Sequence, residues 1–154
     1  MKRIMEEMLQ RLFMCLIGIL LLTNICNAQS SAQYSEMYFQ RAVDQTRVGS
    51  HTEAIIACTY LIKADSSRSE LFYLRSYNFF KLGNKSAAMR DVDLCLSIDP
   101  LKSEAHLLRA KINSSSGRFI DAYKDYRRAR ELNPVQAVLS ITKDFFSFVV
   151  PGSS

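Results

Sequence analysis

One eighteen-residue pattern occurs three times in this chain at a fixed spacing of 34 residues. It reads GSHTEAIIACTYLIKADS from Gly49, GNKSAAMRDVDLCLSIDP from Gly83 and GRFIDAYKDYRRARELNP from Gly117. Windows that begin at residues 35, 69 and 103 therefore align without a gap. Repetition at this period is typical of proteins in which one small helical unit stacks on the next. The sequence predicts a linear stack of similar units.

The residues that recur in each window indicate how a unit folds. A glycine separates two helical patterns, and it ends the first helix in a left-handed conformation. An alanine five residues later lets the two helices approach closely, and a proline closes the second helix. In the first window Ser66 stands in place of that proline. We assign these structural roles to Gly49, Ala54, Gly83, Ala88, Pro100, Gly117, Ala122 and Pro134.

The third window shows the amphipathic pattern of the second helix. Its apolar side chains recur at helical spacing and are expected on one core-facing stripe, with the charged ones off that stripe. One helical hairpin cannot bury such a stripe alone, whereas three stacked hairpins share a continuous core. The predicted stripe is Phe119, Ala122, Tyr123, Tyr126, Ala129 and Leu132, and the charged residues off it are Lys124, Arg127, Arg128 and Arg130.

These windows resemble the tetratricopeptide repeat (TPR), most fully in LFYLRSYNFFKLGNKSAAMRDVDLCLSIDP. The resemblance implies an all-α fold, a right-handed superhelical solenoid of three helical hairpins plus a C-terminal capping helix. The repeats are assigned to residues 35–68, 69–102 and 103–136, and the capping helix and tail to residues 137–154. The cap pattern, residues 135–149, is out of register, because continued windows would place Ser140 and Lys143 on the core face. Its apolar Phe146 and Val150 suggest a contact surface.

The resemblance also implies a binding mode: the first helix of each pair lines a concave groove that holds a peptide or partner protein. Aromatic residues commonly dominate such interfaces, so Tyr73, Tyr77 and Phe80 are the predicted anchors, with packing between repeats as the alternative role. The predicted groove residues are Phe39, Val43, Arg47, Tyr73, Tyr77, Phe80, Lys81, Leu107 and Lys111.

One subclass of the family clamps the C-terminal carboxylate of a peptide with basic and amide side chains. Apolar Phe39, Val43 and Leu74 stand here where some of those polar residues are needed, and Glu104 stands where a lysine is needed. The resemblance therefore implies a groove without that clamp.

No motif for catalysis, a metal or a cofactor is found, and the chain is not expected to be an enzyme. His51 and His106 lie in different repeats, away from ligand partners, and are expected to be surface or half-buried helix residues. The carboxylates are expected to scatter over helix surfaces rather than to pair. Recurrence of one arginine with the repeat, at Arg41, Arg75 and Arg109, indicates a structural role.

The charges give little support to a nucleic-acid partner. A formal net charge of +5 is weak, and the RRAR run at residues 127–130 is expected to form a salt-bridged face with nearby acidic residues. Cys58 and Cys95 are expected on core-facing stripes, and the sequence leaves open whether they are bonded.

Residues 1–28 have the layout of a secretory signal peptide, with basic residues around a short apolar run from Leu12 to Leu22. That run is shorter than the roughly 20 residues that span a bilayer. Cleavage is expected after Ala28, leaving a linker over residues 29–34 and no membrane span. A retained anchor and an internal core helix are the alternatives, and a start at Met8 gives a cleaner signal. The protein is then exported, to the periplasm or outside the cell.

Two functions remain. The first is a non-catalytic adaptor or scaffold in the cell envelope that binds a peptide or partner protein in its groove. The alternative is a structural subunit that self-associates as a homo-oligomer, or docks in an envelope complex, through its apolar C-terminal helix.

Overall fold

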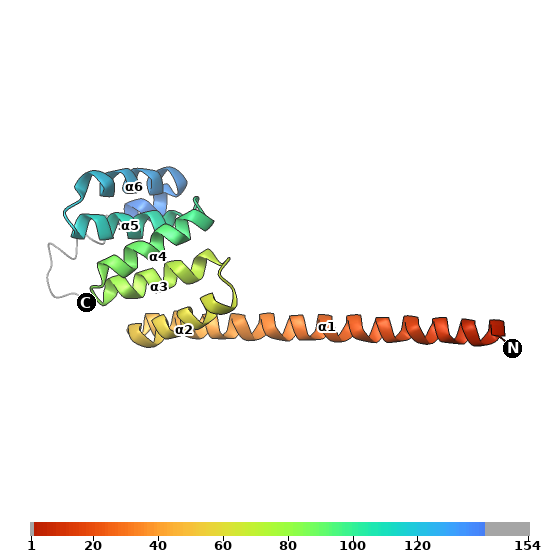
Figure 1. Ribbon diagram of the computed structural model, residues 1–154. Coiled ribbons are helices and arrows are strands. Elements are labelled where there is room, and N and C mark those ends of the chain that lie inside the picture. Colours follow the sequence, from red (N-terminus) through yellow and green to blue (C-terminus); the bar gives the residue numbers. More distant parts are fainter. Residues whose placement is uncertain (1, 141–154) are drawn as a thin grey trace. The chain divides into compact units, whose positions relative to one another are not determined.

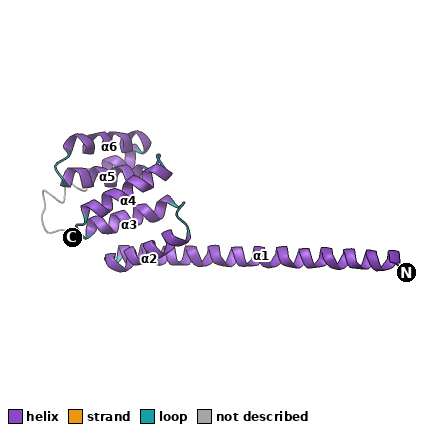
Figure 2. Ribbon diagram, viewed as in Figure 1, coloured by secondary structure: helices purple, strands orange, loops and turns teal. Residues whose placement is uncertain are grey.

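The computed structural model describes residues 2–140, except the side chains of residues 2–7, 9, 10, 12, 15 and 22–32. The described elements are all helices, joined by short turns (Figures 1 and 2). They are α1 (Lys2–Arg47), α2 (His51–Ala64), α3 (Ser69–Lys81), α4 (Lys85–Ile98), α5 (Ser103–Ser115) and α6 (Phe119–Leu132), followed by a helical stretch over residues 134–140.

The chain divides into two compact units, residues 1–38 and residues 39–154. Helix α1 contains the boundary, and it runs without a break through residues 29–34, where the sequence suggested a linker. Among the described residues, no helix is long and apolar enough to cross a membrane. Cleavage after Ala28 stays a prediction.

Within residues 39–154, consecutive helices from α2 to α6 pack against each other as hairpins (Figure 1). The α3–α4 and α5–α6 hairpins each turn at a glycine, Gly83 with φ 79° and Gly117 with φ 75°, and Gly49 before α2 has φ 84°. These left-handed angles are costly for residues with a Cβ. The predicted all-α fold of stacked hairpins is confirmed.

The core lies between the hairpins and depends on small side chains at the helix crossings. Ala54 and Ala88 have no exposed surface, and Ala122 is 3% exposed. The larger core side chains come from α3, α4 and α5 together, so the second and third hairpins share one core. The buried members of this cluster are Phe72, Ala88, Val92, Cys95, Leu96, Ala105, Leu108 and Ile112.

Part of the stripe predicted on α6 is wrong. Ala122 and Ala129 are buried, but Phe119 and Tyr123 are 69% and 66% exposed. Their equivalents one repeat earlier are Lys85, which is exposed, and Met89, which packs partly buried against the shared core. In the described part of the chain no further hairpin follows α6 to cover Tyr123 in the same way.

Two arginine–aspartate pairs with buried carboxylates join the two helices of a hairpin. They overturn the expectation that the carboxylates stay on helix surfaces. Arg75 Nε and Nη2 donate to the two oxygens of Asp91 at 2.7 and 2.8 Å. Arg109 Nε donates to Asp125 Oδ2 at 3.0 Å, and its Nη2 donates to Oδ1 at 2.7 Å. Each aspartate is nearly buried, follows its arginine by sixteen residues and lies on the second helix of the same hairpin.

The same arginines also reach the preceding hairpin. Arg75 Nη1 donates to Thr59 Oγ1 at 3.2 Å, and Arg109 Nη1 donates to Asp93 Oδ1 at 3.0 Å. Thr59 and Asp93 are 34 residues apart, so the two contacts are equivalent. The recurring arginine therefore joins neighbouring hairpins, as its recurrence indicated for these two positions.

The first member of the series, Arg41, is exposed. The position sixteen residues later, where the other two windows carry aspartate, is Ala57. The structural role predicted for Arg41 therefore does not extend to a buried carboxylate pair.

The start of the predicted capping helix is helical through residue 140. Ala137 is buried and packs with Leu107 and Ala129, which attaches this stretch to the α5–α6 hairpin. Phe146, Val150 and the rest of the predicted cap lie outside the described residues.

Candidate functional site

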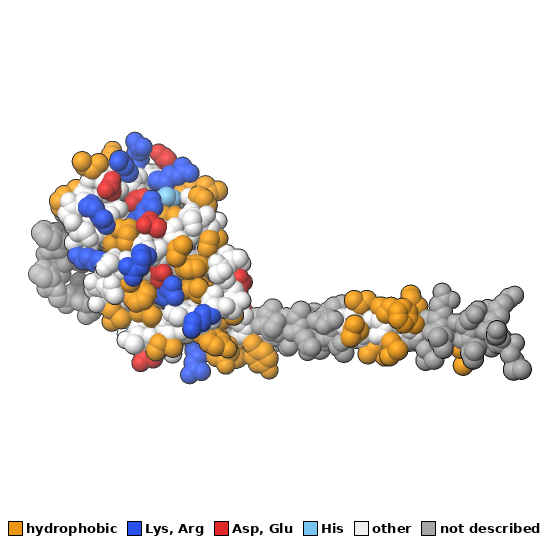
Figure 3. Space-filling view, viewed as in Figure 1, with side chains coloured by type: hydrophobic (Ala, Val, Ile, Leu, Met, Phe, Trp, Pro, Cys, Tyr) orange, Lys and Arg blue, Asp and Glu red, His pale blue; other side chains and the backbone are white. Residues whose placement is uncertain are grey.

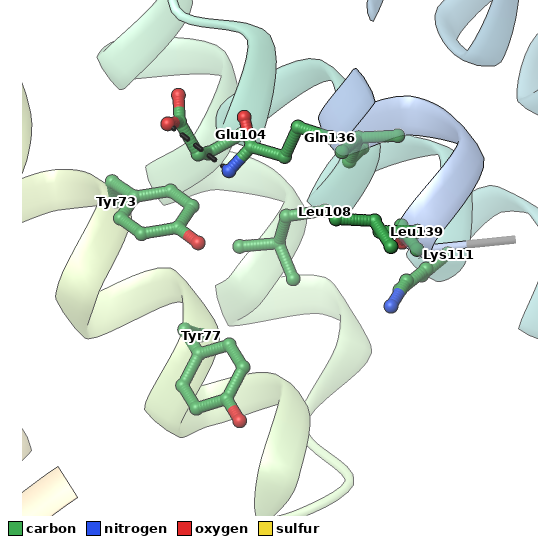
Figure 4. Close-up of a pocket in the computed structure, with 9 residues that line it drawn as sticks. Tyr73, Tyr77, Glu104, Leu108, Lys111, Gln136 and Leu139 are labelled. Atoms are coloured by element: carbon green, nitrogen blue, oxygen red, sulfur yellow. Dashed lines mark hydrogen bonds between the residues drawn. The ribbon is translucent and has the colours of Figure 1, made fainter. Parts of the chain in front are cut away.

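A hollow of about 280 Å³ opens between α3, α5 and residues 134–140 (Figure 4). We call it the groove. Side chains of α3, of α5 and of the stretch after α6 line the groove. It therefore forms where these three elements pack together. Its lining residues are Tyr73, Tyr77, Glu104, Leu107, Leu108, Lys111, Gln136, Leu139 and Ser140.

Two tyrosines form one wall of the groove. Tyr73 and Tyr77 are four residues apart on α3 and therefore lie on the same face of that helix. Both are half-buried and pack against the shared core, and the Tyr73 ring points toward Leu108 (Figure 4). Burial, together with the nearby charge of Glu104, raises the pKa of Tyr73 to about 12. Its hydroxyl therefore keeps its proton at neutral pH and can donate a hydrogen bond.

The polar side of the groove is a short hydrogen-bond chain. Gln136 Nε2 donates to Glu104 Oε1 at 3.2 Å, the contact drawn dashed in Figure 4. Ser103 Oγ donates to Gln136 Oε1 at 2.9 Å. Lys111 follows Glu104 by seven residues, or about 10 Å along the helix. The groove thus has an acidic end, an apolar middle and a basic end.

The structure brings four of the nine predicted groove residues to this hollow: Tyr73, Tyr77, Leu107 and Lys111. Leu107 is the most buried of the four and also packs against Ala129 and Ala137. Whether these side chains touch a partner stays a prediction.

The other five predicted groove residues do not line the hollow. Phe39 and Val43 pack against the cluster of Ala42, Cys58 and Leu74, and Phe80 packs against the shared core. The remaining two are exposed: Arg47 pairs with Asp44 at 3.4 Å, and the Lys81 ammonium lies 5.6 Å from the ring centre of Tyr77.

Five lining residues were not among the predicted groove residues: Glu104, Leu108, Gln136, Leu139 and Ser140. Glu104 is on the face of α5 that carries Leu107, Leu108 and Lys111, at helical spacing. The 34-residue register could have identified Gln136, the last residue of the third window, because it follows Lys102 by one period.

Both histidines make contacts with other residues of the repeats. His51 Nδ1 lies 2.8 Å from Asn78 Oδ1. His106 is buried, with its Nε2 3.1 Å from the Pro100 carbonyl oxygen and its Nδ1 3.4 Å from Asp125 Oδ1. His51 is half-buried, as expected, but His106 lies deeper than the surface or half-buried position expected for it. Within residues 2–140, no three His, Cys, Asp or Glu side chains are placed to hold a metal ion.

The arginine-rich stretch of α6 lies on a mixed-charge surface. Glu131 accepts from Arg128 at 3.3 Å and lies 3.8 Å from Arg127, while Lys124 pairs with Asp121 at 3.5 Å. Basic and acidic side chains are interspersed over the face of the molecule shown in Figure 3. The expected salt-bridged face is present, except that Asp125 turns inward to Arg109.

A second, more open hollow of about 510 Å³ lies at the start of α4 and the turn before α6. Basic Lys85, Arg90 and Arg118 line it with Asp93, and Lys85 Nζ donates to the Ser115 carbonyl oxygen. Part of its positive charge is thus already engaged by the protein.

No model of a known protein family matches the sequence. A curated protein, the DnaJ homolog subfamily C member 7 homolog of Dictyostelium discoideum, is 27% identical over 113 residues. The alignment covers 73% of this chain and 20% of that protein. The chain therefore spans only about a fifth of the length of this relative.

Solved structures with the same arrangement of helices include several with bound peptides. The first TPR of Spaghetti (RPAP3) bound to HSP90 peptide SRMEEVD has a TM-score of 0.66 and 22% identity, over 77% of this chain and 95% of that chain. The Yersinia enterocolitica type III secretion chaperone SycD, in complex with a peptide of the translocator YopD, has a TM-score of 0.64 and 15% identity, over 70% and 89%.

The second TPR domain of human RPAP3, in complex with HSP70 peptide SGPTIEEVD, has a TM-score of 0.62 and 23% identity, over 71% of this chain and 96% of that chain. At these identities the likeness establishes the fold. The chain described here has the fold of a tetratricopeptide-repeat domain.

Proposed function

We propose that this chain is a non-catalytic peptide-binding module, which holds a segment of a partner protein in the groove. The observation that carries the proposal is the hollow itself, in which Tyr73, Tyr77 and Leu108 present apolar surface next to Glu104 and Lys111. Concave apolar sites with a few polar groups are the usual form of ligand sites. Aromatic side chains in such sites commonly contribute most of the binding energy.

Solved structures with the same fold also support peptide binding. Structures of the RPAP3 domains and of SycD hold short peptides of other proteins. The likeness to these structures covers 70–77% of this chain. The proposal that this chain binds a peptide rests on that analogy together with the groove, and not on the fold alone.

A peptide library displayed on phage and selected on the full chain tests the proposal. We expect selected peptides to lose about 2 kcal/mol of binding free energy, roughly thirtyfold in Kd, when Tyr77 is replaced by alanine. Tyr60→Ala is the matched control, because Tyr60 is 68% exposed on α2 and lies outside the groove.

Circular dichroism on both variants separates lost binding from lost folding. If Tyr77→Ala unfolds the chain, Tyr77→Leu keeps an apolar side chain against the core and removes the ring. Peptide binding that changes by less than about 0.5 kcal/mol in a folded Tyr77 variant contradicts the groove assignment.

We further propose that the module acts as an adaptor or scaffold in the cell envelope, after export and cleavage behind Ala28. This location rests on the sequence of residues 1–28 alone. N-terminal sequencing of the protein recovered from its native cells tests it. A mature chain that begins at Gln29 supports export, and a chain that retains residues 1–28 contradicts it.

A structural subunit is the second candidate. Val135, Val138 and Leu139 are 71%, 54% and 63% exposed, which is unusual for three apolar side chains so close in sequence. Mass measured by light scattering over a hundredfold range of concentration separates the candidates. A mass that stays monomeric argues against self-association through this surface.

A further inference from the structure

We infer that the groove selects peptides with a lysine or arginine side chain that pairs with Glu104, next to an apolar side chain that rests on Tyr73 and Leu108. The inference rests on the proposed function and names the chemistry of its ligand. It begins from a comparison of two equivalent positions in the repeat, Glu70 and Glu104, which are 34 residues apart.

The second repeat neutralises its glutamate within the chain. Lys102 Nζ lies 3.9 Å from Glu70 Oε1, so the carboxylate has a cation beside it. One period later, the residue equivalent to Lys102 is Gln136. Gln136 keeps the contact, donating to Glu104 Oε1 at 3.2 Å, but it is neutral.

Among residues 2–140, Glu104 therefore contacts neutral donors only. In the described part of the chain its hydrogen-bond partners are Gln136 and Ser103, and no cation lies within ion-pair distance. The negative charge of Glu104 affects a neighbouring groove residue, since it contributes to the raised pKa of Tyr73. Glu104 is half-buried already, so a ligand in the groove would remove it further from water.

Covering a carboxylate is costly unless the covering group supplies a positive charge. A basic side chain of the ligand does so, and it restores the ion pair that Lys102 and Glu70 make one repeat earlier. An acidic peptide such as SRMEEVD or SGPTIEEVD brings like charges to Glu104 instead. Charge complementarity therefore favours a basic peptide and disfavours an acidic C-terminal one.

The spacing of the groove sets where the apolar residue belongs. Tyr73 and Leu108 lie between Glu104 and the far end of the groove (Figure 4). An extended peptide rises about 3.3 Å per residue, so roughly three residues span the distance from Glu104 to Lys111. The apolar side chain is expected within three residues of the basic one.

Selection of a random peptide library on the full chain tests this, followed by titration of the best peptide. We expect lysine or arginine to be enriched near an apolar residue. Replacing that basic residue of the peptide by methionine is expected to weaken binding about fivefold, the magnitude of a partly exposed ion pair. The substitution Glu104→Gln is expected to do the same.

Two further variants and one control make the test specific. Gln136→Lys places the missing cation inside the chain, as in the second repeat, and should remove the preference for basic peptides without removing binding. Glu104→Lys should shift the preference toward acidic peptides. Glu53→Lys is the control, because Glu53 is an exposed residue of α2 outside the groove and changes the net charge equally.

The outcomes separate the inference from the proposed function. Peptides that bind through Tyr77 but show no basic preference, or whose preference ignores Glu104, overturn the inference and leave the function standing. Selection of acidic C-terminal peptides overturns it as well. Binding that Tyr77→Ala leaves intact overturns the proposed function itself, and so does a groove that is filled only by a second copy of the chain.

Discussion

At the scale of single residues, the arginine–aspartate pairs explain how polar groups can stabilise a solenoid core. Arg109 reaches Asp125 on its own hairpin and Asp93 on the hairpin before. These contacts raise the pKa of Arg109, chiefly through the hydrogen bonds that it donates to Asp125. The guanidinium therefore stays charged and holds two hairpins in register.

Removing one member of such a pair is expected to be costly. The variant Asp125→Ala leaves the Arg109 guanidinium without its buried acceptor, and His106 and Asn113 lose a partner too. We expect about 3 kcal/mol lower free energy of unfolding in urea titrations. The control Asp121→Ala, on the exposed side of α6, should change it by less than about 0.5 kcal/mol. Equal effects would contradict a structural role for the buried pair.

The buried thiol of Cys58 gives a pH prediction. Burial raises its pKa from 9.0 to about 12. Between these values the unfolded thiol ionises while the folded one keeps its proton, so stability falls as pH rises above about 9. From pH 8 to pH 10 the loss through this thiol is about 1 kcal/mol.

Urea titrations at pH 8 and pH 10 measure that loss. Other groups titrate in the same range, so the informative quantity is the difference between the wild-type chain and Cys58→Ala. The variant should lose less stability between the two pH values. An identical loss in both proteins would show that the thiol is not protected.

At this scale the sequence predicted the alanine and glycine positions well, because their 34-residue recurrence is visible without a structure. It missed the carboxylates Asp91 and Asp125. Their signal was available as an aspartate sixteen residues after the recurring arginine, but that pairing joins two helices and is not a local pattern. Exposed Phe119 and Tyr123 were misplaced because their burial requires a further hairpin packed against α6.

At the scale of the elements, the helix ends differ in how they are capped. Asn84 precedes α4, and its side chain accepts a hydrogen bond from the Ala87 amide at 3.1 Å. Ser50 precedes α2 at the equivalent place, and its side chain makes no such bond. Both positions come directly after a left-handed glycine. Comparing Ser50 with Asn84 therefore shows the effect of the capping hydrogen bond alone.

The variant Asn84→Ala is expected to lower the free energy of unfolding by about 1 kcal/mol, the usual loss for an N-cap. Ser50→Ala should have a much smaller effect, because it removes no capping bond. Thermal melts of both variants provide the measurement. A larger effect at Ser50 than at Asn84 would contradict this account of how the helices begin.

The turn glycines are an equally local feature. In Gly83→Ala a methyl group meets no atom within 4 Å, but the backbone keeps φ 79°. We expect a loss of about 1–2 kcal/mol from the conformation alone. Gly83→Asn should lose less, because asparagine tolerates this region better. If alanine and asparagine are equally harmful in urea titrations, a reason other than backbone conformation is required.

At the scale of the whole molecule, the chain is expected to bind as one folded unit over residues 39–140. Deleting residues 1–28 removes part of the other compact unit and leaves α2 to α6 whole. We expect the melting temperature of the remaining chain to stay within about 2 °C, the shift produced by a few tenths of a kcal/mol in a domain of this size. A large decrease would show that residues 1–28 stabilise the repeats.

The general position of the groove could be predicted from the repeat, since Tyr73, Tyr77, Leu107 and Lys111 meet there. Of the far wall, the 34-residue period could have indicated Gln136, which follows Lys102 by one period. Leu139 and Ser140 could not be predicted, because the residues after the third repeat depart from its apolar pattern. Phe39 and Val43 were assigned to the groove because the family resemblance places the first helix of each pair there, but they pack against Cys58 and Leu74 instead.

The most direct test of the central claim is to locate a selected peptide on the chain by NMR, from the amide shifts that change on titration. We predict that the largest changes cluster at Tyr73, Tyr77, Lys111 and Gln136, on α3, α5 and the stretch after α6. Changes that cluster instead around Lys85 and Arg118, at the second hollow, would contradict the account and place binding on a different surface.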